Sequence, residues 1–408
     1  MVVTFLKREE LSVLNPRVFI LAIATFVVGT VELIIGGTLD LIAQDLQVSI
    51  SSAGQLITIF SLAFSISAPL LLHLTRRIER KPLYLYALAV FFLSNVLAAL
   101  SPTYTVLMVA RILSAASSAL LVVLSISIAA SIVDPAYRGR AIGIIFMGIS
   151  GSLVLGVPVG LALGNAFGWR APFWLIAALS ILSMLFLIYF LPKVKTPEPV
   201  PLREQLAILK NGKIISALLV SLFMLTGHLT LYAYFTPYLK TTLGVDASML
   251  SLIYFVFGLA AVAGGGAGGW FSDKWGAKKA ILWIVPLFAL VMSVLPFFTS
   301  SLPVFLVIMV IWSALSWAIS PAQQNYLIYS SPAAPDLPLG LNTSALHLGI
   351  AFGSMAGGMV VEQASVTYTP WVGALFVLVS FGCAIFSITR PLKHEAAETK
   401  QSLSNQTA

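Results

Sequence analysis

The sequence predicts an all-α membrane protein in which twelve transmembrane helices form two pseudo-symmetric halves of six, and three observations support this prediction. Of the 408 residues, 59% are apolar and only 9% are charged, whereas about 25% are charged in soluble proteins. The apolar residues fall into twelve runs, and a membrane-spanning helix needs about 20 such residues. The chain also repeats itself at an offset of 197 residues. These observations exclude a soluble enzyme.

The twelve runs are separated by short polar loops, so we justify the helices in chain order. The first run follows Lys7 and Arg8, as the apolar segment of a signal peptide would. It is long, contains Glu32 and shows no clear cleavage site. We therefore interpret it as a retained helix. The runs cover residues 18–41, 50–73, 83–100, 103–131, 141–165, 172–191, 214–239, 248–271, 280–298, 302–328, 338–362 and 371–389.

The basic residues predict the orientation of these helices. If the spans alternate, all but three of the 23 Lys and Arg residues fall on the side of the two termini. The exceptions are Arg170 and Lys240 on the other side and Arg111 within a span. The positive-inside rule then places both termini in the cytoplasm of a multi-pass cell membrane protein. Because topology accounts for the net charge of +8, we expect no nucleic-acid partner.

The internal repeat predicts the division of the chain. The offset aligns LTRRIERK (74–81) with FSDKWGAKK (271–279), and Gly156 with Gly353. We therefore expect two six-helix halves, 1–191 and 214–390, with a cytoplasmic linker at 192–213 and a disordered polar tail at 391–408. Parallel repeats of this kind are typical of transporters with a central cavity between the halves. A duplicated helix bundle without transport activity is the alternative.

The loop after the eighth span carries a recognisable motif. Its sequence GGWFSDKWGAKK (268–279) resembles the loop motif of the major facilitator superfamily, with matches at Gly269, Asp273, Lys274, Gly276 and Lys278. The equivalent loop of the first half departs from the motif, since Leu72, Arg76 and Glu79 replace glycine, aspartate and glycine. The resemblance implies the fold of that superfamily and a gating role for the loop. The alternative is that the basic residues of the loop only determine the membrane topology.

A few ionisable residues lie deep within the spans, where charge is costly and usually functional. Glu32 lies about 14 residues, or roughly 21 Å, into the first helix. Arg111 lies about 13 Å below the outer face. A buried acid near a cation can be tuned to exchange protons near neutral pH, so we expect Glu32 to carry protons with Arg111 as its counter-charge. The alternative is a static buried pair. Further candidates for proton coupling are Asp40, which could also be a solvated carboxylate, and His228.

The fifth span is rich in glycine and contains a proline. In GISGSLVLGVPVGLALG (148–164), small residues recur at four-residue spacing, which lets helices approach closely. Pro158 removes a helix hydrogen bond and should bend the span. With Gly156 and Gly160 it resembles, in variant form, the antiporter motif of drug:proton exchangers of the superfamily. The resemblance implies a gating role, although close packing alone also explains the pattern.

The second half places neutral polar and aromatic side chains at span depth. Side-chain amides can form hydrogen bonds with the edge of a heterocycle, and aromatic rings can stack on its faces. These residues therefore suit a planar, polar, uncharged solute. Hydrogen bonds between helices are the alternative. The candidate substrate-binding residues are Asn342, His347, Gln323, Gln324, Asn325, Tyr232, Tyr234, Trp312 and Trp317.

Several segments, including VELIIGGTLDLIAQDL (31–46), GHLTLYAYFTPYL (227–239) and SPAQQNYLI (320–328), resemble the bacterial purine base and nucleoside efflux pumps of the superfamily's drug:proton antiporter branch. This resemblance implies proton-coupled export of purine bases or nucleosides. Sugar and chloramphenicol exporters of the same superfamily are the runner-up. No cofactor or metal site is expected, no His or Cys spacing fits an intramembrane enzyme, and a monomer in the lipid bilayer is the default.

Overall fold

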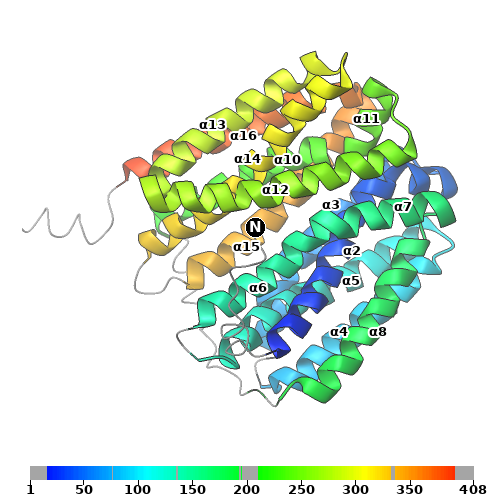
Figure 1. Ribbon diagram of the computed structural model, residues 1–408, viewed down its shortest axis with the longest axis vertical. Coiled ribbons are helices and arrows are strands. Elements are labelled where there is room, and N and C mark those ends of the chain that lie inside the picture. Colours follow the sequence, from blue (N-terminus) through cyan, green and yellow to red (C-terminus); the bar gives the residue numbers. More distant parts are fainter. Residues whose placement is uncertain are drawn as a thin grey trace, which may run out of the picture. The chain divides into compact units, whose positions relative to one another are not determined.

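The computed structural model describes residues 16–75, 77–134, 137–192, 194, 210–331 and 336–390 as a set of helices (Figure 1). Twelve stretches of these residues are long and apolar enough to cross a membrane, which agrees with the predicted number of spans. Most of the predicted linker and the whole predicted disordered tail, 391–408, lie outside the described residues.

The first six spans are built from seven α-helices and one π-helical segment. They are α2 (Arg17–Asp45), α3 (Ile50–Leu74), α4 (Arg80–Ala99), α5 (Tyr104–Ser131), α6 (Arg138–Gly151), η2 (Ser152–Gly156), α7 (Val157–Phe167) and α8 (Ala171–Phe190). The fifth span thus consists of α6, η2 and α7. The π-helical turn lies directly before Pro158, whose missing N–H and bulky ring disturb the regular hydrogen-bond ladder. The fifth span therefore leaves regular α-helical geometry just before the proline, and the bend at Pro158 stays a prediction.

The second six spans contain one break that the hydropathy pattern does not reveal. They are α10 (Gly212–Tyr232), α11 (Phe235–Leu243), α12 (Ala247–Trp275), α13 (Ala277–Val294), η3 (Leu295–Phe298), α14 (Leu302–Ser330), α15 (Asp336–Gln363), η4 (Val366–Tyr368) and α16 (Thr369–Thr389). We expected one helix over 214–239, but α10 ends at Tyr232 and α11 begins at Phe235. Pro237 explains the break, because its ring would clash with the carbonyl four residues earlier.

The described contacts divide the chain into two compact units. Unit 1 contains Met1–Pro199, Tyr232–Leu259 and Gly358–Val366, and unit 2 contains Val200–Leu231, Ala260–Gly357 and Thr367–Ala408. In unit 1, α4 packs between α5 and α8, and in unit 2, α13 packs against both α14 and α16 (Figure 1). The two units do not follow the sequence repeat, and the half boundaries at 191 and 214 stay predictions.

Candidate functional site

Glu32 and Arg111 lie close together in unit 1, as the sequence predicted for a buried acid and its counter-charge. The Glu32 side chain on α2 is half-buried, Arg111 on α5 is only 1% exposed, and the two interact electrostatically. The proton-carrying role of Glu32 stays a prediction.

Arg111 joins three helices. Its Nη1 donates to the carbonyl oxygen of Val31 on α2 at 2.7 Å, and its Nε donates to that of Leu56 on α3 at 3.4 Å. The guanidinium carbon lies 4.1 Å from the ring centroid of Phe60. The Nη2 atom is buried and has no hydrogen-bond partner among the residues that the structure describes. The Nη2 group of Arg111 therefore stays available to a further hydrogen-bond acceptor.

The two aspartates at the far end of α2 bind the only two basic residues predicted on that side of the membrane. Asp40 forms an ion pair with Lys240 of α11. Asp45 accepts a hydrogen bond from Arg170 at 2.6 Å and one from the indole of Trp169 at 3.0 Å. Asp40 is thus a partly exposed, paired carboxylate, and sequence analysis missed both partners. Lys240 and Arg170 are the two basic residues predicted on the side of the membrane opposite the termini, and this unusual position could have indicated that each has an acidic partner.

Residues 232–259 of the second half pack tightly on first-half helices within unit 1. The Thr236 hydroxyl donates to the carbonyl oxygen of Gly36 at 3.1 Å, two residues before a non-helical residue at Thr38. Tyr234 fills a slot over Gly54, where an added Cβ would lie 1.9 Å from the Tyr234 hydroxyl oxygen. Tyr234, predicted as a substrate contact, therefore makes close helix-packing contacts here. Thr236 and Gly54 were not predicted, since both act through shape and backbone contacts.

Tyr232 belongs to an aromatic cluster in the same unit. Its ring centroid lies 4.9 Å from that of Phe257, 6.0 Å from that of Tyr254 and 6.3 Å from that of Phe235. All four rings are buried. The other predicted substrate contacts belong to unit 2.

The fifth-span glycines face α2, a partner that their spacing did not identify. A Cβ at Gly156 would lie 2.2 Å from the Thr30 hydroxyl oxygen, and a Cβ at Gly160 would lie 2.0 Å from the Ile34 side chain. In the same unit, Gly258 of α12 approaches the backbone of η2, where its Cβ would lie 2.6 Å from the Leu153 oxygen. Close packing is thus present on two sides of the π-helical turn, and the gating role of these glycines and Pro158 stays a prediction.

His228 occupies an aromatic site in unit 2. Its ring centroid on α10 lies 5.1 Å from that of Trp312 on α14 and 5.9 Å from that of Phe288 on α13. His228 is 7% exposed and Trp312 is fully buried. The His228 ring therefore packs against two aromatic side chains. Its role in proton coupling or in substrate contact stays a prediction.

The predicted amides of α14 and α15 differ in what they contact. Gln323 is 2% exposed and donates to the Ala217 carbonyl oxygen on α10, and Asn342 is 4% exposed. The buried Gln323 Oε1 and Asn342 Oδ1 atoms have no hydrogen-bond partner within the described part of the chain. Buried polar atoms are usually satisfied, so these two oxygens are the best candidates to accept hydrogen bonds from a solute.

The remaining predicted contacts are less buried or are already used within the protein. Gln324 donates to the Ser320 hydroxyl at 3.2 Å, and the exposed Asn325 donates to the Ser272 hydroxyl at 3.0 Å. The Nδ1 atom of His347 lies 2.9 Å from the Thr343 carbonyl oxygen. His347 and Trp317 are half-buried. Gln324 and Asn325 therefore have local partners that explain them without a solute.

The loop motif forms a tight turn between α12 and α13. Gly276 adopts φ +86°, a conformation that glycine tolerates and other residues rarely adopt. The Lys274 ammonium lies over the rings of Trp270 and Trp275. Asp273 is exposed and forms no ion pair with any residue in the described ranges. A Cβ added at Gly269 would make only ordinary van der Waals contact with Pro321. The turn is explained by Gly276, and a latch through Asp273 stays a prediction.

Comparison with known proteins identifies similar transporters. The family model of the Major Facilitator Superfamily matches residues 21–335 and again residues 218–406. The uncharacterized MFS-type transporter YbcL of Bacillus subtilis (strain 168) is 38% identical, over 89% of this chain and 93% of its own. The inner membrane transport protein YdhP of Escherichia coli (strain K12) is 30% identical over the same shares. The crystal structure of a D-xylose–proton symporter matches with a TM-score of 0.77 at 19% identity, over 92% of this chain and 98% of that one, which confirms the predicted fold.

Proposed function

The chain belongs to the major facilitator superfamily, and from this premise we propose that it exports purine bases or nucleosides in exchange for protons. It is a multi-pass membrane transporter of a small molecule, from a family of transporters and not of enzymes. The proposal adds a coupling ion, a direction and a substrate class to that coarser description.

The proximity of Glu32 to the buried Arg111 carries the coupling part of the proposal. When Glu32 is protonated, Arg111 keeps its bonds to the backbone of α2 and α3. When Glu32 is deprotonated, the Nη2 group of Arg111 is available to compensate the carboxylate. Loss of a proton would thereby tighten the contact between α2 and α5, which gives the proton a mechanical effect on helix packing.

The contacts at the Asp40 end of α2 support a gate that opens and closes during transport. The Asp40–Lys240 ion pair and the Thr236–Gly36 hydrogen bond join a first-half helix to a second-half helix. We propose that these bonds hold the outer side closed and separate when the protein faces outward. Because the ion pair is partly exposed, it is weak enough to break in every cycle.

The unpartnered oxygens of Gln323 and Asn342 support an uncharged hydrogen-bond donor as the substrate. Purine bases carry N–H groups at ring edges and flat faces, which suits these acceptors and the rings of Trp312 and His228. The resemblance to purine efflux pumps adds weight to this class. A sugar or a chloramphenicol-like drug is the alternative, since a sugar hydroxyl could also donate to these oxygens.

The deciding experiment measures uptake of labelled hypoxanthine, adenosine, arabinose and chloramphenicol into inverted vesicles with an imposed pH gradient. The native protein should concentrate the purines, and Glu32→Gln should abolish concentration because its side chain cannot exchange a proton. Glu362→Gln is the matched control, since Glu362 is an exposed carboxylate in the last turn of α15.

Each result has a distinct meaning. Uptake of a sugar or drug without purine uptake would overturn the substrate class and leave proton coupling intact. If Glu32→Gln still concentrates substrate, the proton carrier must be sought at Asp40 or His228. If Glu362→Gln fails as severely as Glu32→Gln, the effect is not specific to the buried acid.

A further inference from the structure

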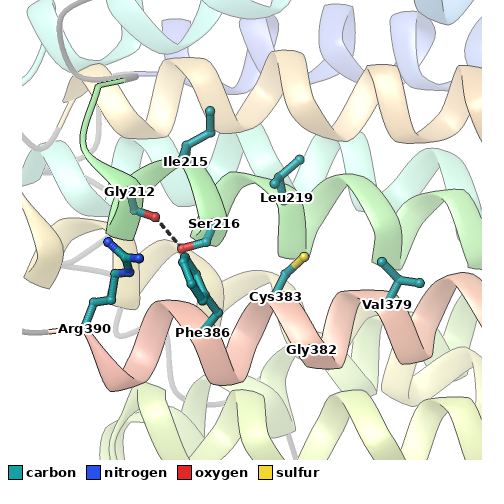
Figure 2. A pocket seen from close by; sticks show the side chains of 9 residues that line it. All are labelled: Gly212, Ile215, Ser216, Leu219, Val379, Gly382, Cys383, Phe386 and Arg390. Atoms are coloured by element: carbon teal, nitrogen blue, oxygen red, sulfur yellow. Dashed lines mark hydrogen bonds between the residues drawn. The ribbon is translucent and has the colours of Figure 1, made fainter.

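A groove in unit 2 runs along α10 and α16, and none of its lining residues is assigned to transport (Figure 2). It has a volume of about 590 Å³. The groove exists because small residues face it, including Gly212 and Ser216 on α10 and Gly382 and Cys383 on α16. Its other walls are apolar side chains that are 39–48% exposed, as expected for surfaces that face lipid: Ile215, Val379 and Phe386.

One end of the groove carries a free positive charge. The Arg390 guanidinium reaches from the end of α16 across to the start of α10, where its Nη1 would lie 3.3 Å from a Cβ on Gly212. It stacks 4.2 Å above the ring of Phe386, and no carboxylate in the described ranges pairs with it. Lys210, two residues before Gly212, is also exposed. This end is therefore cationic, while the rest of the groove is apolar.

The other polar groups near the groove are already bonded within the protein. The Ser216 hydroxyl donates to the Gly212 carbonyl oxygen at 2.6 Å (Figure 2). The Lys213 ammonium is buried and donates to the carbonyl oxygens of Ser387 and Arg390. Arg390 is thus the cation within the groove that can receive an external anion.

We propose that this groove binds one anionic phospholipid of the surrounding bilayer, with its phosphate on Arg390 and an acyl chain along α10 and α16. The lining runs from Val379 to Arg390, which is about 16 Å of helix and about half of the roughly 30 Å hydrocarbon core. An acyl chain of one leaflet has this reach. Arginine forms paired hydrogen bonds with phosphate oxygens, and cationic pockets between transmembrane helices suit anionic headgroups.

Cys383 provides a built-in reporter, because it is the single cysteine of the chain and lines the groove. The experiment measures the rate of Cys383 alkylation by a membrane-permeant maleimide in detergent, with added phosphatidylglycerol or with phosphatidylcholine of the same acyl chains. Phosphatidylglycerol at ten times its dissociation constant should slow alkylation about tenfold, since only about a tenth of the sites stay empty. Phosphatidylcholine should slow it far less.

The variants Arg390→Gln and Arg77→Gln separate specific binding from general charge effects. Arg390→Gln should lose the protection by phosphatidylglycerol, whereas Arg77→Gln, which removes an exposed arginine outside the groove, should keep it. Equal protection by the two lipids, or protection that survives Arg390→Gln, would overturn the proposal. So would a Cys383 that is already unreactive without added lipid, because another segment would then fill the groove.

Discussion

The two halves that the sequence repeat predicts carry different side-chain chemistry at equivalent positions. At the repeat offset of 197 residues, Glu32 corresponds to Leu229 and Arg111 to Ile308. The first half thus carries a half-buried acid and a buried cation, while the second half carries apolar residues there and uncharged amides such as Gln323 and Asn342 nearby. The difference suggests a division of labour, in which the first half handles protons and the second half recognises an uncharged solute.

The largest expected effect comes from substituting one residue of the equivalent pair Arg111 and Ile308 at a time. Arg111→Gln removes the guanidinium that bonds to Val31 and interacts with Glu32. Because Glu32 would lose the cation with which it interacts, proton exchange should no longer be coupled to transport, and we expect gradient-driven uptake into vesicles to be lost. Ile308→Leu keeps volume and polarity and should leave uptake within a few-fold. Equal losses in the two variants, at equal amounts of folded protein, would contradict the division of labour.

The glycines of the fifth and eleventh spans allow a second comparison. A Cβ at Gly156 meets the Thr30 hydroxyl, whereas a Cβ at Gly353 would lie 2.4 Å from the backbone oxygen of Thr226. A side chain can rotate and a helix backbone cannot, so Gly353→Ala should destabilise the protein by about 1–3 kcal/mol, and Gly156→Ala by less. Thermal unfolding in detergent measures both.

The double variant Gly156→Ala with Thr30→Ala sharpens this prediction. Removing the Thr30 hydroxyl should restore most of the stability lost in Gly156→Ala. Thr226→Ala should not rescue Gly353→Ala, because the obstructing atom belongs to the backbone. Rescue in both pairs would show that the two helix contacts are equally adaptable.

The fold was more predictable than the contacts, for physical reasons that particular residues make clear. Twelve spans can be predicted from hydropathy alone. The four-residue spacing of Gly156 and Gly160 indicates close helix packing. The break at Tyr232 needed the steric effect of Pro237 to outweigh an apolar run. The Lys240–Asp40 pair joins residues 200 positions apart, and the Thr236–Gly36 bond uses a backbone acceptor that any residue would offer. The one sequence feature that indicated a partner for Lys240 is its predicted position on the side of the membrane with few basic residues.

The turn before the second span of each half provides a smaller test. Gln47 has φ +51° and its repeat equivalent Gly244 has φ +60°, so both adopt a left-handed conformation that costs a non-glycine residue about 1–2 kcal/mol. Gln47→Gly should therefore raise stability by up to about 1 kcal/mol, after the entropic cost of glycine is subtracted. Gly244→Gln should lower it by a similar amount. Opposite shifts in melting temperature would establish that the two turns share one backbone.

The smallest expected effect concerns the helix caps that follow these turns. Ser49 accepts a hydrogen bond from the Ser52 N–H at 3.0 Å, and its repeat equivalent Asp246 accepts one from the Met249 N–H at 2.8 Å. That bond, with one from the Ser248 hydroxyl, holds the pKa of the Asp246 carboxyl below its usual value of 3.8.

Because the folded pKa of Asp246 is lowered, its stabilising effect is complete above the unfolded pKa of about 3.9 and fades as pH falls through the folded value. Asp246→Ala should therefore lower the melting temperature slightly at pH 7, and the difference from the native protein should shrink below about pH 4. Ser49→Ala should cause a loss of similar size that does not change with pH, since serine does not titrate in this range. A pH-independent effect at both positions would mean that the Asp246 charge contributes nothing beyond the hydrogen bond that Ser49 also accepts.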